Sequence, residues 1–212
     1  CHFQCCLGFR MANHHLFGHG HMLFNLHWIL ADQMRADALG CSGNSLARSP
    51  CLDRLAARGA RFTRHITPNQ ICSPSRATIF SGLYPRHHGL VRNGIPLADD
   101  VPLLTHVLKR AGYRTHGVGK FHFQPMAASA EHGMPDSWRF WEDPDNQGWA
   151  GPFYGVDRVN SVLGESACAT RGGHYAQWVR ERAPELARLY HPEAALTAPP
   201  PDLEEVWTSA VP

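Results

Sequence analysis

The sequence lacks a strong net charge, because 20 Lys and Arg residues nearly balance 18 Asp and Glu residues and leave a formal charge of +2. Composition therefore gives no reason to expect nucleic acid or an anionic membrane surface as a partner. The chain also lacks an apolar run of the roughly 18 residues that a membrane-spanning helix needs. We therefore expect a soluble protein that binds neither nucleic acid nor a membrane.

Paired cysteine spacings are missing as well. The seven cysteines are an odd number and do not follow the spacing of a disulfide framework. No basic start followed by an uninterrupted apolar core is present, so no secretory signal is recognised and we expect a cytoplasmic protein. A length of 212 residues gives room for one domain with a substantial core.

The two ends of the chain differ in composition from the rest. Cysteines and histidines are concentrated in residues 1–21, without a Cys-x-x-Cys or other paired ligand spacing. We expect an unstructured or artefactual leader here, with a metal-binding tract as the alternative. The domain itself is expected over residues 22–190, and the stretch 191–212 is expected to be a linker or truncated end.

Strand and helix patterns alternate along the expected domain. Residues 23–31 form an apolar run that is typical of a buried central strand. Beyond it, helix patterns occur at 49–59, 99–112 and 172–179, and strand patterns at 60–66, 113–118 and 156–159. This order predicts an α/β fold with a mixed, mostly parallel sheet flanked by helices on both faces.

The stretch 71–85 carries the strongest chemical signal. Ser73 is expected to cap a helix that ends at Gly82. Cys72 then lies at the helix N-terminus with Arg76 a turn further on, where positive potential and free N–H groups suit an anion or a thiolate. The alternative is a buried cysteine that packs as a small hydrophobic residue.

Further polar residues follow two of the predicted strands. Asp32 follows the run 23–31, and open α/β sheets bind ligands at the carboxyl ends of their strands. Its oxygens suit a hard divalent cation, although an Asp here can equally cap the next turn. Lys120 and His122 follow the strand at 113–118. Two residues apart on an extended strand, their side chains would point to the same side.

The motifs resemble those of a known family. The run Cys72-x-Pro74-x-Arg76, followed by Ala77-Thr78 and Ser81-Gly82-x-x-Pro85-x-x-His88-Gly89, resembles the signature of the type I sulfatases, which are formylglycine-dependent members of the alkaline-phosphatase-like superfamily. Gly119-Lys120-x-His122 is similar to a second motif of that family. The resemblance covers roughly residues 23–190 and implies the N-terminal part of a catalytic domain.

The resemblance implies a mechanism for the cleavage of a small-molecule or saccharide sulfate ester. A formylglycine-generating maturation enzyme would convert Cys72 to formylglycine. One hydroxyl of the hydrated aldehyde would attack sulfur, and the alcohol of the ester would leave. The second hydroxyl would then expel sulfate as the aldehyde re-forms. A divalent metal, expected to be Ca²⁺, would be bound by Asp32 and residue 72. The groups expected to contact the hydrate or the sulfate are Arg76, Lys120 and His122.

Three further residues are candidates for substrate contact. Gln33 stands where many sulfatases have a second Asp, so it can contact the metal or the anionic group of the substrate. Asn93 is similar to a substrate-facing position of phosphonate monoester hydrolases, or it caps a turn before Gly94. His174, in a Gly-His-Tyr-x-x-Trp run, can reach the substrate or pack within the fold.

Two other functions stay open at this stage. Gln33 and Asn93 favour a phosphonate or phosphate monoester hydrolase with the same nucleophile, whereas the Gly-Lys-x-His run argues against it. The resemblance also implies further metal ligands, an Asp with Asn or His, from a later segment that we do not find. A catalytically inactive fragment that acts as a binding module is therefore the other alternative.

Overall fold

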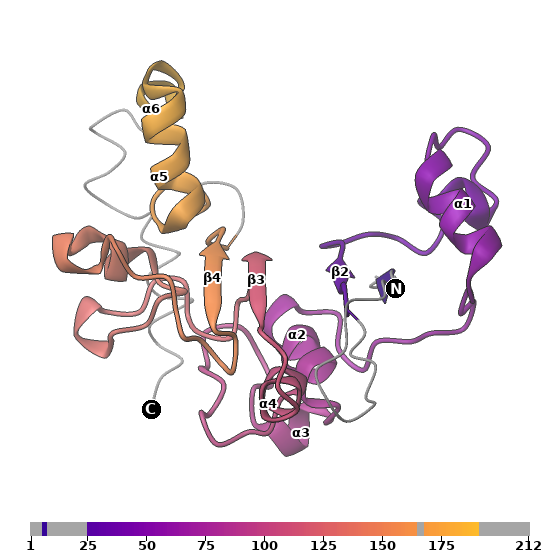
Figure 1. Ribbon diagram of the computed structural model, residues 1–212, viewed down its shortest axis with the longest axis horizontal. Coiled ribbons are helices and arrows are strands. Elements are labelled where there is room, and N and C mark those ends of the chain that lie inside the picture. Colours follow the sequence, from indigo (N-terminus) through magenta and orange to yellow (C-terminus); the bar gives the residue numbers. More distant parts are fainter. Residues whose placement is uncertain (1–5, 8–24, 165–167, 191–212) are drawn as a thin grey trace, which may run out of the picture. The chain divides into compact units, whose positions relative to one another are not determined.

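The computed structural model describes residues 6–7, 25–164 and 168–190. The chain divides into two compact units, Cys1–Gln70 and Ile71–Pro212 (Figure 1). Of the expected leader only Cys6 and Leu7 are described, and the expected linker 191–212 lies outside the described residues. No helix in the described ranges is long and apolar enough to cross a bilayer.

The first unit contains a short antiparallel sheet and one α-helix. Its elements, in order, are β1 (Cys6–Leu7), β2 (Ile29–Leu30), the 3₁₀ turn η1 (Gly40–Ser42) and α1 (Pro50–Arg58). The predicted helix is confirmed, with proline at its first position and Gly59 directly after its end. Ser49 precedes the helix, but its hydroxyl accepts a hydrogen bond from the Gly40 N–H (2.9 Å) and donates one to Asp53 (3.0 Å) instead of capping a helical N–H.

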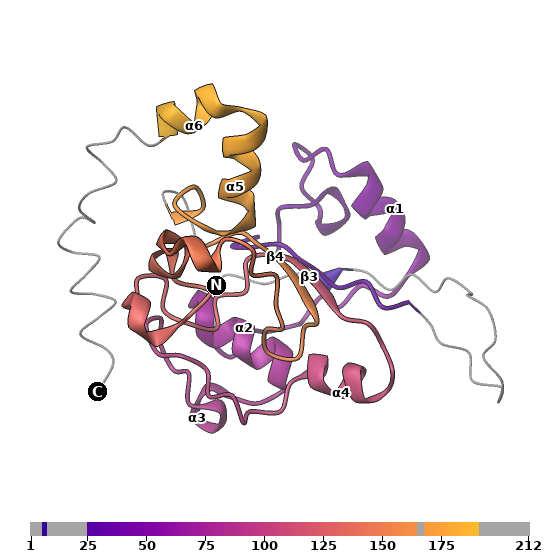
Figure 2. The same ribbon diagram turned by 60° about the vertical axis from the view of Figure 1, so that its left-hand side comes forward.

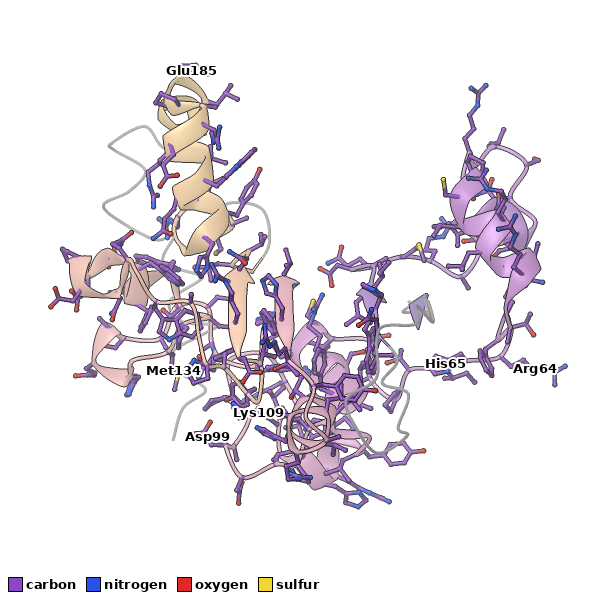
Figure 3. All side chains as sticks on the ribbon, viewed as in Figure 1. Arg64, His65, Asp99, Lys109, Met134 and Glu185 are labelled. Carbon is purple, nitrogen blue, oxygen red and sulfur yellow. The ribbon has the colours of Figure 1, made fainter. Side chains whose placement is uncertain are left out.

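Two strand predictions in this unit are wrong. Among the described residues of the run 23–31, only β2 is a strand, and the Ile29 side chain is 60% exposed. A central strand needs partners along its length, and the described pairing of this run extends over two residues of β1. Residues 60–66 form an exposed loop, from which Arg64 and His65 point outward (Figure 3). An alternating pattern alone does not make a strand when no neighbouring strand pairs with it.

The second unit contains a small parallel sheet. β3 (His116–Gly119) and β4 (Arg158–Ser161) lie side by side and point the same way (Figures 1 and 2). The helices of this unit are α2 (Cys72–Ser81), α3 (Pro85–His88), α4 (Leu104–Arg110), the 3₁₀ helices η2 (Ala130–His132), η3 (Trp138–Glu142) and η4 (Pro144–Asn146), α5 (Gly173–Arg182) and α6 (Pro184–Tyr190). The α/β class and the parallel pairing are thus as predicted.

The two strands of this sheet begin three and two residues later than predicted, at His116 and Arg158. The shift arises because Tyr113 and Thr115 make hydrogen bonds that are not part of the ladder between the two strands. The Tyr113 N–H donates to the Leu108 carbonyl at the end of α4 (3.0 Å), and the Thr115 N–H donates to the Asp157 carboxylate (3.1 Å). These bonds close the turns that lead into β3 and β4, so the ladder begins only at His116.

Aromatic side chains form most of the core of the second unit. One cluster contains Phe121, Phe123 and Phe153 with six aliphatic residues, and a second contains Trp138, Phe140 and Trp141. Phe121 and Phe123 lie on either side of His122 and are 6% and 0% exposed. The core therefore fixes the segment after β3 on both sides of that histidine.

Gly155 is a position where only glycine fits. It has φ +77°, and a Cβ there would lie 2.8 Å from the His106 backbone nitrogen in α4. We expect Gly155→Ala to lower the free energy of unfolding by about 1–3 kcal/mol, because left-handed strain and a backbone clash act together. Urea denaturation followed by tryptophan fluorescence measures this change.

Gly148→Ala is the matched control, since no atom lies within 4 Å of the Cβ that it would add. Equal losses in the two variants would contradict this account of Gly155.

Candidate active site

The signature cysteine lies in the first turn of α2. The helix begins at Cys72 and ends at Gly82, which has φ +71°, as the sequence predicts. Ser73 is not the cap, however, because Ile71 precedes the helix and Ser73 is a buried residue of its first turn. The Ser73 N–H instead donates to the Asn93 Oδ1 atom (3.1 Å). The oxygen that satisfies this helical N–H thus comes from a loop twenty residues away.

Arg76 joins the signature helix to the second motif. Its side chain is buried, and its Nη1 atom donates to the backbone carbonyl of Lys120 (2.5 Å). A hydrogen bond from a charged donor is stronger than one between neutral groups. The structure therefore brings α2, which carries Cys72 and Arg76, against the segment that carries Lys120 and His122.

The backbone leaves strand geometry before it reaches Lys120. β3 ends at Gly119, which has φ +109°, and His122 has φ +59°. The segment that carries Lys120 and His122 is therefore not an extended strand, so the strand geometry expected for it is wrong. His122 is 1% exposed, whereas Lys120 is partly exposed. A left-handed, non-glycine residue costs on the order of 1–3 kcal/mol and persists only where its surroundings hold it.

A buried carboxylate holds the segment after His122. Asp136 Oδ2 accepts hydrogen bonds from the Phe123 N–H (2.8 Å) and the Gln124 N–H (3.1 Å). Burial raises the pKa of Asp136 to about 6, while hydrogen bonds from the backbone of residues 122–124 and the positive Arg76 act in the opposite direction.

Asp136 is not among the residues that the sequence predicts for the site. Its surroundings, Met134-Pro135-Asp136-Ser137, match no motif, and the only local signal is a carboxylate directly before the aromatic stretch that begins at Trp138. Which backbone groups it contacts depends on a turn that brings residue 136 back to residues 123 and 124. A single sequence does not reveal that contact.

The histidine at the end of the signature has a structural role. The Leu90 N–H donates to the His88 Nδ1 atom (3.2 Å), so the proton lies on Nε2, which faces the Thr78 hydroxyl of α2 (3.1 Å). Burial lowers the pKa of His88, so the neutral form is favoured. His88 thereby ties α3 to α2.

His174 also has packing contacts. Its Nδ1 atom accepts a hydrogen bond from the Ser161 N–H at the end of β4 (3.1 Å), and its ring lies 5.1 Å from the Trp141 ring. Burial lowers the pKa of His174. These contacts support the packing interpretation, and substrate contact by His174 stays a prediction.

Asp32 and Gln33 lie in the first unit, in an exposed turn directly after β2. Within the described ranges, no group of three or more His, Cys, Asp or Glu side chains is arranged to hold a metal ion. Calcium in proteins takes about six to eight oxygen ligands, and one carboxylate supplies at most two. The ligand role of Asp32 therefore stays a prediction.

Comparison with known proteins identifies the family. The Sulfatase family model matches residues 25–188, so the chain belongs to the sulfatase family. It is similar to an ulvan-active sulfatase of Formosa agariphila, with 31% identity over 66% of this chain and 27% of that protein. It is also similar to the human steryl-sulfatase, with 31% identity over 64% of this chain and 24% of that protein.

A solved structure supports the fold assignment. The phosphonate monoester hydrolase of Agrobacterium radiobacter is 30% identical, with a TM-score of 0.50, and the match covers 80% of this chain and 31% of that one. The fold is alkaline-phosphatase-like and incomplete, as the sequence predicts. The chain spans about a quarter to a third of the length of these proteins.

The Asn93 contact gives a testable prediction. We expect Asn93→Ala to destabilise the second unit by about 1–3 kcal/mol, because the Ser73 N–H in a buried first turn loses its acceptor. Asn93→Asp keeps an acceptor oxygen and should lose less. Urea denaturation measures the stability of each variant, and hydrogen exchange measures protection of the Ser73 amide. Unchanged Ser73 protection in Asn93→Ala would contradict the assigned contact.

Proposed function

We propose that this chain carries the nucleophile-bearing part of a sulfuric ester hydrolase and that Cys72 is the precursor of a formylglycine. The observation that carries the proposal is the hydrogen bond from Arg76 to the Lys120 carbonyl, which joins the two motifs within one unit. Membership of the sulfatase family supports the reaction class. In the conversion the Cβ–S bond would break, the sulfur would leave as hydrogen sulfide, and a C=O bond would take its place, with the two electrons lost by Cβ passing to an oxidant used by the maturation enzyme.

The roles of the chain's own residues follow from their chemistry and position. Cys72 lies in the first turn of α2, where the helix dipole favours negative charge near residue 72. The Lys120 ammonium would neutralise charge on a sulfuryl oxygen, and the His122 imidazole would move a proton. Arg76 would add positive potential and hold the Lys120 backbone in place.

The proposal includes a divalent cation, expected to be Ca²⁺. Asp32 and the oxygens of the modified residue 72 are the ligands that this chain would supply. Such an ion supplies Lewis-acid chemistry when it is bound. Calcium takes about six to eight oxygen ligands, so the remaining ligands would come from other groups.

The substrate class follows from the named relatives. An ulvan-active sulfatase and a steryl-sulfatase are similar to this chain, so saccharide and other small-molecule sulfate esters are the substrates to assay. The phosphonate monoester hydrolase is the competing assignment because it is similar over 80% of the chain. Gln33 and Asn93 remain candidate substrate contacts under either assignment.

The modification of Cys72 can be tested directly. After co-expression with a formylglycine-generating enzyme, peptide mass spectrometry should show residue 72 without its sulfur and reactive toward a hydrazide probe. Cys51→Ser is the matched control, because Cys51 is an exposed cysteine outside both motifs and its loss should leave the conversion intact. An unmodified thiol at residue 72 in every preparation would rule out the proposed nucleophile.

Kinetics tests the roles of the second motif. In an enzyme that contains this chain, Lys120→Ala and His122→Ala should each lower kcat for an aryl sulfate by about 10²–10³-fold, because each removes a group proposed to act on the transition state. The aryl phosphonate and phosphate esters serve as competitor substrates. Preference for a phosphonate ester would favour the competing assignment, and no turnover of any ester with residue 72 converted would favour an inactive fragment.

A further inference from the structure

We propose that Asp136 is a positioning residue, whose buried carboxylate holds the backbone after His122 and so fixes where Lys120 and His122 point. The inference rests on the proposed roles of those two residues in sulfate ester hydrolysis. Asp136 itself touches backbone amides, so it acts through the segment that it holds.

The contacts of Asp136 form an anion-binding turn. Its carboxylate accepts the N–H groups of Phe123 (2.8 Å) and Gln124 (3.1 Å), and the His122 backbone also hydrogen-bonds to it. Consecutive N–H groups converge on one anion when the chain changes between left-handed and right-handed geometry. His122 supplies the left-handed residue, with φ +59°. The carboxylate thus stabilises the strained conformation that His122 adopts.

Asp136 is itself held rigidly. The Trp141 Nε1–H donates to the Pro135 carbonyl (2.9 Å), and the Ser137 hydroxyl donates to the Ala128 carbonyl (2.7 Å). The Trp138 N–H donates to the Met126 carbonyl (3.0 Å). The residue before Asp136 is therefore held by a buried indole, and the two residues after it are held by buried backbone carbonyls, so the position of the carboxylate is fixed on both sides.

Two side chains of opposite charge hold the two ends of the segment 120–124. The Arg76 guanidinium donates to the Lys120 carbonyl at one end, and the Asp136 carboxylate accepts amides at the other. Arg76 also attracts the Asp136 carboxylate. Removing the Asp136 carboxylate would take away the acceptor of the N–H groups of residues 123 and 124. The Arg76 guanidinium would then be the remaining charged group of the two that hold this segment.

Amide NMR tests the contact without any need for catalysis. In the unmodified chain, the Phe123 and Gln124 amide protons should move downfield together with a midpoint near pH 6, because an ionised acceptor makes the stronger hydrogen bond. The other groups that act on this carboxyl are the positive Arg76 guanidinium and the His122 backbone, and Tyr154, whose pKa is raised by burial, also interacts with it. Asp136→Asn should abolish this shared transition, and its persistence in that variant would overturn the proposal.

Kinetics tests the positioning role. Asp136→Ala should lower kcat for an aryl sulfate by about 10²-fold with a smaller change in KM, since misplacement of catalytic groups by a fraction of an ångström acts mainly on the transition state. Asp136→Asn keeps an acceptor oxygen and should recover part of that loss. Asp143→Asn is the matched control, because Asp143 is exposed and the one described contact of its carboxylate is the N–H of the nearby Asp145.

The outcomes separate this inference from the proposed function. Unchanged kcat in Asp136→Asn and Asp136→Ala, in an enzyme that turns over sulfate esters, would overturn the positioning role and leave the function intact. If residue 72 is never converted, the proposed function fails, and the amide titration still decides whether Asp136 holds the segment. If Asp136→Ala does not fold, the wild-type titration and the Asp136→Asn rate decide the question.

Discussion

The arrangement of the second unit depends on the burial of the Arg76 guanidinium. A buried charge is costly unless hydrogen bonds and an opposite charge compensate for it. Here the Lys120 carbonyl accepts from Arg76 (2.5 Å), and the buried Asp136 carboxylate supplies the opposite charge. This hydrogen bond and this opposite charge offset the cost of burying Arg76. They therefore also hold α2, which carries Cys72, against the segment that carries Lys120 and His122.

The aromatic core gives this polar arrangement its rigidity. Phe121 and Phe123 alternate with the site residues Lys120 and His122, and the Phe123 ring packs edge-on against Phe80 of α2 (5.1 Å between ring centroids). Packing fixes the alternate side chains, so the residues between them have little freedom to turn. The short segment therefore combines buried aromatic anchors with the candidate site residues Lys120 and His122.

Much of the local structure followed from sequence because its causes are local. Proline at the start and glycine at the end delimit α1, and Gly82 ends α2 with a left-handed conformation that glycine adopts readily. The strand predictions for 23–31 and 60–66 failed because a strand forms only when another strand pairs with it, and pairing is not encoded in the alternation of one segment. The true boundaries of β3 depended in the same way on contacts with α4 and Asp157.

The sequence by itself determined the family, the α/β class and which residues are candidates for the chemistry, because motif spacing places Cys72 and Arg76 on one helix and Lys120 and His122 after one strand. Only the tertiary structure decided how these groups are held. The Asn93 oxygen on the Ser73 amide and the Asp136 carboxylate on the Phe123 amide are contacts between distant segments. Each contact forms because a turn brings two distant segments together, and the hydrophobic periodicity of a single sequence does not specify where those segments meet.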